Sequence, residues 1–350
     1  MRVPWGRIII FGTIVVLIVV VFTVFKGILL PLVFAFLLSY ILGPLVDRME
    51  GMGISRTAAI ILLYLAMFGL LAVGIAVLVP VIRDQAQKIA QNFPTYQARI
   101  QKVALDLGEM MDRYVPGLSE KLGDRVSGWF GRTMETLVQK GIEWVQGLIS
   151  TFTLVVIVLF GSFFFLRDGH RFKTALVQLV PNRYFEMTLN LIWRIDRQIG
   201  GYIRGQVLEA AAVGILATIG FAIIDLPYFI LVGAIEGAAN IIPYFGPLIG
   251  FIAATLVAFL TGGSGTLVLG AAVVCLAVQQ IDNFLIQPTV MARSVALHPL
   301  VVMFAVLAGG SVMGVVGMVL AVPVVGILKV MVQTALEGIR TYRASQELAR

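Results

Sequence analysis

The chain has 350 residues, of which 59% are hydrophobic and 13% are charged, and its mean hydropathy is +0.97. Soluble domains carry about 25% charged residues, so this composition excludes an ordinary soluble enzyme or binding domain. The net charge of +7 does not indicate a nucleic-acid partner, because the basic residues flank apolar runs and form no single patch. The only cysteine, Cys275, excludes an internal disulfide framework, and we expect no cofactor.

The first half contains four apolar runs of the length that a membrane-spanning helix needs. They cover residues 8–25, 28–46, 58–80 and 148–166. The first run follows two arginines, as in a signal peptide. It is longer than a typical signal core, however, and no small-residue cleavage pattern follows it, so we expect a retained span.

A water-facing insertion, residues 81–147, separates the third and fourth spans. Apolar residues recur in it at helical spacing with charges between them, which predicts amphipathic helices. We expect breaks near Pro94 and at Val115-Pro116-Gly117. Because its acidic and basic residues nearly balance, packing on a partner helix is favoured over binding to a lipid surface.

The distribution of arginine predicts the orientation. Segment 47–57 carries Arg48 and Arg56 and shares a side with the N-terminus if the first two runs both span, and segment 167–205 carries seven basic residues against three acidic ones. The positive-inside rule therefore places both segments in the cytoplasm. The insertion then lies outside, and both termini lie in the cytoplasm of a bacterial-type cell. We divide the chain into five parts. The first three are a scaffold of three spans (1–80), the insertion (81–147) and a fourth span with a basic segment (148–205). A transport core (206–337) and a cytoplasmic tail (338–350) follow.

Two of the apolar runs in the second half are interrupted. The run 228–261 contains Pro243, Gly246 and Pro247, which cannot lie together inside an intact helix. The run 299–335 contains G-G-S-V-M-G, which includes Gly310. Two half-helices that fold back as a hairpin explain each run, and such breaks must be buried or line a watery cavity.

Each hairpin follows an ordinary span, 207–224 or 266–287, and the two units start on opposite sides of the membrane. This order predicts an inverted repeat, which in secondary transporters places the solute between broken helices. The expected fold is an all-α polytopic membrane protein with about eight membrane segments, two of them broken or re-entrant hairpins, plus the amphipathic extramembrane insertion.

Polar residues at membrane depth mark the candidate site. Glu236 lies one helical turn before Asn240, so both face the first break. A charge in the bilayer costs at least ~2.5 kcal/mol, which favours a proton, cation or solute site. The alternative is a structural carboxylate bonded to backbone at the break. Asp282, with Asn283 and Gln279 nearby, is a second candidate for coupling or gating, or an interfacial contact.

Other polar residues have simpler explanations. We expect Arg204, Gln206 and Glu209 to make local contacts where a span leaves the cytoplasm, and His298 to start a helix. G-G-S-G at 262–265 resembles the serine motif of intramembrane proteases, but His298 would lie at the opposite membrane face from that serine. No metal motif or phosphate-binding loop is present in the sequence, so neither an enzyme nor an ATP-driven pump is expected.

Four motifs resemble the autoinducer-2 exporter family of permeases, in the same order and spacing. They are N-I-I-P-Y-F-G-P-L-I-G from Asn240, D-N-F-L-I-Q-P from Asp282, S-V-A-L-H-P-L from Ser294 and G-M-V-L-A-V-P from Gly317. The resemblance covers essentially the whole chain. Many relatives have glutamate where this chain has Asn240, and Glu236 is the nearest carboxylate to that position.

This resemblance implies an eight-segment, homo-oligomeric permease. The name of the family comes from export of autoinducer-2, and other members are described as sodium/proton antiporters. We therefore expect a secondary transporter that exports autoinducer-2 or a similar small polar molecule by alternating access, with a proton or sodium as candidate coupling ion. A sodium(lithium)/proton antiporter is the main alternative, and a channel or protease is a weaker one.

Overall fold

The computed structural model describes residues 26–112, 152–182, 185–261, 265–290 and 297–348, and a few single residues between 125 and 136. In these ranges the chain is helical and contains no strand. The first predicted span, the predicted break at Val115-Pro116-Gly117 and, apart from those single residues, the part of the predicted insertion after residue 112 lie outside the described residues.

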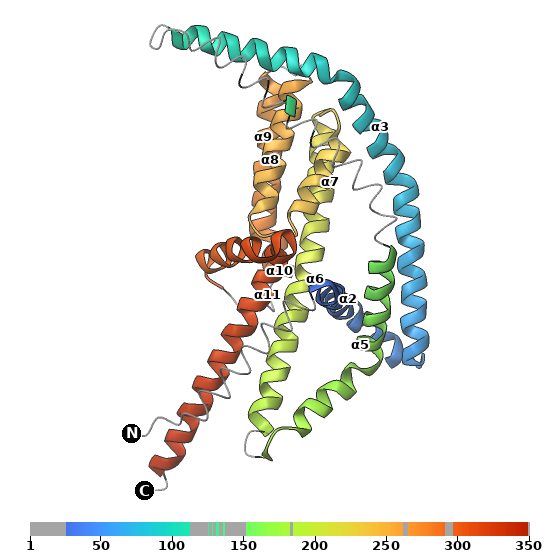
Figure 1. The fold of residues 1–350 in the computed structure, drawn as a ribbon, viewed down its shortest axis with the longest axis vertical. Helices are drawn as coiled ribbons and strands as arrows, with labels where there is room; N and C mark the ends of the chain where they lie inside the picture. Colours follow the sequence, from blue (N-terminus) through green and yellow to red (C-terminus); the bar gives the residue numbers. More distant parts are fainter. Residues whose placement is uncertain are drawn as a thin grey trace. The chain divides into compact units, whose positions relative to one another are not determined.

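Nine α-helices and one π-helical turn make up the described chain (Figure 1). In chain order they are α2 (Lys26–Gly51), α3 (Arg56–Asp112), α5 (Phe152–Gln178), α6 (Phe185–Ile223), α7 (Phe229–Ala239), α8 (Phe245–Leu260), α9 (Gly265–Ile281), the π-helical turn η2 (Asp282–Ile286), α10 (Gln287–Val290) and α11 (Pro299–Leu348).

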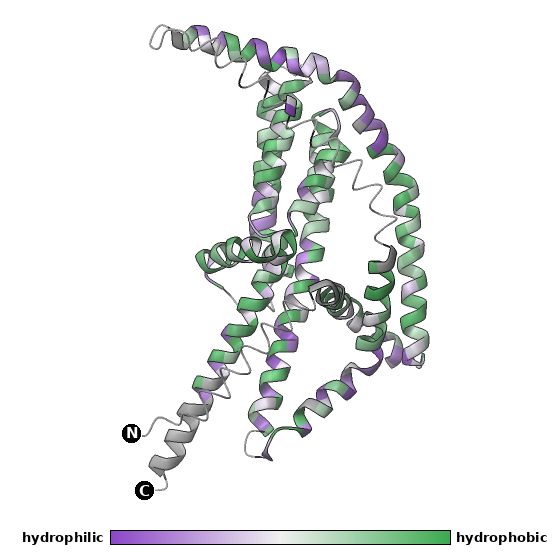
Figure 2. Cartoon of the chain, in the orientation of Figure 1, coloured by the Kyte–Doolittle hydropathy of each residue, from purple (hydrophilic) through white to green (hydrophobic). Residues whose placement is uncertain are grey.

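Five of the described helices are long and apolar enough to cross a membrane, and they lie in α2, α3, α6, α9–α10 and α11. Many of their large apolar side chains are exposed. Figure 2 shows long hydrophobic stretches, coloured green, along the described helices. Exposure of so many apolar side chains to water would be unfavourable in free energy, so we expect them to contact lipid. The prediction of an all-helical, multi-pass membrane protein is confirmed.

Helix α3 differs from the prediction, because it continues for 57 residues through Pro80 and Pro94. The expected break near Pro94 is therefore wrong. Phe93 and Tyr96, on either side of this proline, pack against Leu260 of α8. Proline removes one backbone donor from a helix, and tertiary packing on both sides of it offsets that loss here.

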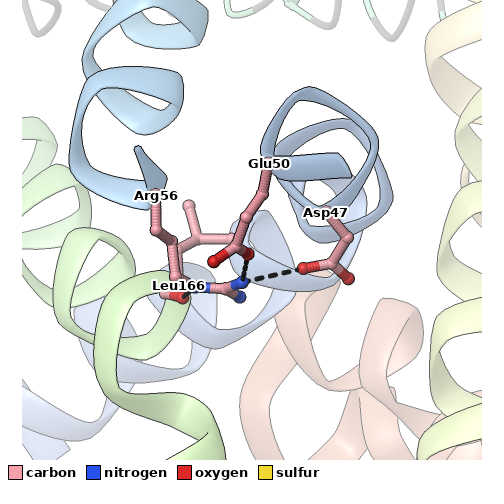
Figure 3. A network of polar contacts seen from close by, with 4 residues as sticks. All are labelled: Asp47, Glu50, Arg56 and Leu166. Atoms are coloured by element: carbon pink, nitrogen blue, oxygen red, sulfur yellow. Dashed lines mark hydrogen bonds and ion pairs between the residues drawn. The ribbon is translucent and has the colours of Figure 1, made fainter. Parts of the chain in front are cut away.

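The chain divides into two compact units, and the first comprises residues 1–66 and 145–179. Within it, α2 packs against α5 around an apolar cluster that includes Leu42, Val46 and Leu166. Arg56 donates hydrogen bonds to the Leu166 carbonyl at 2.6 Å and to the Asp47 carboxylate at 3.0 Å (Figure 3). The same guanidinium also binds Glu50, so one side chain joins three helical segments.

The second unit, residues 67–144 and 180–350, contains the predicted transport core. Helix α6 packs against α7, α9, α10, η2 and α11, and α8 packs between α7 and α9. Glycines allow the closest approaches: a Cβ atom added to Gly237 would lie 2.7 Å from the Cα atom of Gly214. The backbones of α6 and α7 therefore touch, as is common between membrane helices with small residues.

The first predicted break is present between α7 and α8, at residues 240–244. Tyr244 has φ 69° at the start of α8. Pro247 lies in the first turn of α8, where its missing N–H removes no hydrogen bond. With 11 and 16 residues, the two helices rise only ~16 and ~24 Å, each short of the hydrocarbon thickness.

The second interruption lies inside α11, at Met313 and Gly314. Gly314 has φ 60° and ψ −142°, a conformation that favours glycine. The backbones of Gly309 and Gly317 are in close contact, whereas residues eight apart in a straight helix would be ~12 Å apart. The chain therefore reverses direction within the predicted G-G-S-V-M-G segment.

Candidate functional site

A row of buried polar side chains follows one face of α6. The row consists of Gln198, Tyr202, Gln206 and Glu209, spaced four, four and three residues apart. This spacing keeps them on a single helical face. Further along α6, the same face carries buried apolar residues such as Val213 and Phe221. The polar part of α6 thus lies beside the break and the apolar part forms the core.

Gln206 ties α6 to the break. Its side-chain Nε2 donates a hydrogen bond of 2.7 Å to the backbone carbonyl of Asn240, where α7 ends. A helix end leaves carbonyls without intrahelical partners, and this contact satisfies one of them. The expectation of only local contacts for Gln206 is wrong. Hydropathy averaged along the sequence locates the end of an apolar run, but it does not show which residues of the helix face another helix.

Glu236 and Asn240 lie on one face of α7 and are 2% and 4% exposed. Both are packed against glycines of α8. A Cβ atom at Gly250 would lie 2.5 Å from the Glu236 carboxyl carbon, and one at Gly246 would collide with the Asn240 side chain. These two glycines therefore provide the space in which a carboxyl and an amide group fit at the break.

Asp282 is buried at the first position of the π-helical turn η2. The turn packs against α6, and the Asp282 carboxyl is close enough to Glu209 to interact with it electrostatically. Tyr202, seven residues before Glu209 on α6, interacts with it in the same way. Single π-helical turns are rare and are frequent at functional sites.

Several of these buried groups have unsatisfied hydrogen-bonding capacity. Within the described residues of the second unit, the buried side-chain atoms without a hydrogen-bond partner are Tyr202 Oη, Glu209 Oε2, Glu236 Oε2, Asn240 Nδ2, Asp282 Oδ1 and Thr334 Oγ1. A buried unpaired polar group destabilises the fold by about 1–3 kcal/mol, so each needs an explanation. Five of the six lie on α6, on η2, or on α7 and the residue that caps its end.

The structure places the predicted site residues in three locations. Glu236, Asn240 and Gly246 come together at the first break, with Pro243 and Pro247 in its turn and at the start of α8. Asp282 lies beside α6. Gly310 lies at the second break, against Met318.

Gln279 donates a hydrogen bond of 2.9 Å to Asn283 on an exposed face, whereas Asp282 is buried. His298 accepts a hydrogen bond from the Leu300 backbone N–H through Nδ1, at 3.3 Å. The reading of His298 as a residue that starts a helix is therefore confirmed.

Sequence reasoning missed Tyr202, Gln206 and Glu209 as members of this cluster. One available signal was their spacing, since polar residues four and three positions apart next to an apolar run share a helical face. No group of three or more His, Cys, Asp or Glu side chains within the described ranges is arranged to hold a metal ion.

The sequence profile described as "AI-2E family transporter" matches residues 12–337. The chain belongs to the AI-2E transporter family. Two Bacillus subtilis relatives, YrrI and YueF, whose names propose transport, are 31% and 33% identical to it. These alignments cover 88% and 85% of this chain and 86% and 82% of the relatives.

PerM of Escherichia coli K12, whose name proposes a permease, is 26% identical over 90% of this chain and 89% of its own length. The AI-2E family is a family of transporters and permeases and not an enzyme class. The predicted family is therefore confirmed, and transport across a membrane is the general function of the chain.

Proposed function

We propose that the chain carries a small polar solute across a bacterial inner membrane by alternating access, and that this activity is export of autoinducer-2 or a similar molecule. The solute would bind at the break between α7 and α8. The main support is the pair Glu236 and Asn240, which is buried there with one acceptor and one donor atom unpartnered. A polar solute with hydroxyl groups would supply both missing hydrogen bonds.

The short helices support the same mechanism. Because α7 and α8 are each too short to cross the hydrocarbon core, we propose that they enter and leave the membrane on one side as a re-entrant hairpin. The reversal in α11 would form the second hairpin of an inverted repeat. When the hairpins move, the solute bound between them is exposed first to one side of the membrane and then to the other, never to both sides together.

The orientation and assembly follow the sequence expectations. We propose a homo-oligomer with both termini in the cytoplasm and the insertion 81–147 outside. Residues 1–80 would then serve as the scaffold, 148–205 as the fourth span with its basic segment, and 338–350 as a cytoplasmic tail.

Flux into liposomes that contain the pure protein tests this proposal. We expect saturable uptake of labelled autoinducer-2. Glu236→Gln and Asn240→Ala should lower it at least about tenfold, the factor that corresponds to a loss of ~1.4 kcal/mol of solute binding. Glu186→Gln is the matched control, because Glu186 is exposed on α6 far from the break.

Three results would contradict the proposal. Flux that rises linearly with the gradient would indicate a channel, and exchange of sodium or lithium for protons without movement of solute would indicate an antiporter. Wild-type rates in both site variants would remove the site from the solute path.

A further inference from the structure

Glu209 and Asp282 form a second polar centre, on α6 and η2. The two side chains are 5% and 4% exposed, and each has a carboxyl oxygen without a hydrogen-bond partner. They come from elements that pack on each other and interact electrostatically. The solute site described above does not use either of them.

The neighbouring elements carry further titratable groups. Tyr202 interacts with Glu209 and has an unpartnered hydroxyl, and Glu236 of α7 is packed against Gly250. Glu337 of α11 binds Arg194. Arg204 of α6 and Lys329 of α11 have contacts of their own, and none of the ion pairs within the described chain includes Glu209 or Asp282.

Two buried carboxyl groups that interact electrostatically resist being ionised together, because the two negative charges repel and buried surroundings screen them poorly. Such a pair binds one proton between them and titrates as a unit. A metal ion would need more ligands, and no group of three or more metal-ligating side chains is present in the described ranges.

We infer that Glu209 and Asp282 together bind the proton that this transporter exchanges for its solute. The inference rests on the proposed transport function. Glu209 lies three residues from Gln206, and Gln206 binds the carbonyl of Asn240 at the solute site. A change of charge at Glu209 therefore occurs on the face of α6 that contacts the α7–α8 break. The hydrogen bond from Gln206 to Asn240 links proton binding at this pair to solute binding at the break.

Infrared spectroscopy of the full chain in lipid bilayers, titrated with acid and without solute, tests the proton site directly. Wild-type protein should show a carboxylic-acid signal that appears in two separated steps as acid is added. Glu209→Gln or Asp282→Asn should leave a single step, and Glu209→Asp should restore both. Glu186→Gln on the same helix should leave the titration unchanged. If the single variants instead remove independent signals that add up to the wild type, the pair does not share a proton.

A flux experiment separates the failure of this inference from the failure of the transport proposal. Liposomes that contain a pH-sensitive dye are given a gradient of autoinducer-2, and we expect protons to move in the opposite direction in wild type. Solute movement without proton movement would overturn the proton site while leaving transport intact. A two-step titration without solute movement would support the proton site and contradict the proposed solute. Loss of the carboxylic-acid signal on adding sodium at constant pH would assign the pair to a metal cation.

Discussion

The hydroxyl groups of Tyr96 and Tyr228 lie 3.0 Å apart and join α3 to the start of α7. Two further side chains in the same part of α3 form hydrogen bonds with the α7–α8 hairpin. Gln85 accepts a hydrogen bond from the first turn of α7, and Arg99 donates to the last carbonyls of α8. Residues 85–100 of α3 therefore hold both outer ends of the α7–α8 hairpin.

Removal of the Arg99 guanidinium should loosen the end of α8. Arg99→Met leaves the carbonyls of Phe259 and Leu260 without their donor, and hydrogen bonds from charged groups contribute about 1.5–3 kcal/mol each. We expect faster amide hydrogen exchange in the last turn of α8 and little change in α9. Arg83→Met is the control, because Arg83 is an exposed arginine on the same helix. Equal exchange in both variants would mean that Arg99 does not hold the hairpin.

Gly250→Ala should disturb the solute site through a collision. The added methyl group would lie 2.5 Å from the Glu236 carboxyl carbon, so α8 or the carboxyl must shift. Overpacking of this kind destabilises by about 1–3 kcal/mol. We expect a lower thermal unfolding midpoint and a loss of saturable solute flux.

The matched control for this collision is Gly43→Ala, since a methyl group at Gly43 of α2 meets no atom within 4 Å. That variant should unfold at or above the wild-type temperature, because alanine favours helix over glycine. If the two variants behaved alike, close packing of Gly250 against Glu236 would be refuted.

Gly314→Ala should strain the second reversal. With φ 60° and ψ −142°, this position suits glycine, and a side chain there costs about 1–3 kcal/mol. We expect a lower unfolding midpoint and slower transport, measured on the same purified sample. Ser311→Ala, at an exposed helical position three residues earlier, should change neither quantity. Wild-type stability of Gly314→Ala would show that the reversal does not need this conformation.

Arg56→Lys should weaken the first unit although it keeps the charge. Lysine lacks the planar fork with which Arg56 reaches the Leu166 carbonyl and two carboxylates together. Because these groups are partly exposed, we expect a loss of only about 1 kcal/mol in thermal stability. Arg48→Lys on α2 provides the control, and an equal effect of both changes would contradict a special role for the fork.

The helical segments and both breaks could be predicted because they depend on local sequence. Apolar runs must satisfy their backbone within a helix, and Pro243, Gly246 and Pro247, so close together, favour an interruption. The continuity of α3 through Pro94 could not be predicted, since it depends on Leu260, which is far away in the sequence.

Glu209 illustrates the same limit at the candidate site. The apolar run predicted to begin at residue 207 places Glu209 at a membrane boundary, whereas α6 begins at Phe185 and buries Glu209 in its middle. Hydropathy averages all faces of a helix. The burial of one polar side chain depends on the partners of a single face, here η2 and α7.

The contact between Gly214 and Gly237 limits how this protein can move. The atoms nearest to each other at this contact belong to the backbone, so no side-chain rotation there can let one helix slide along the other. Displacement of either helix therefore displaces its neighbour. Glu209 of α6 and the groups of Glu236 and Asn240 at the end of α7 would then move as a single body, so that proton and solute change sides in the same stroke.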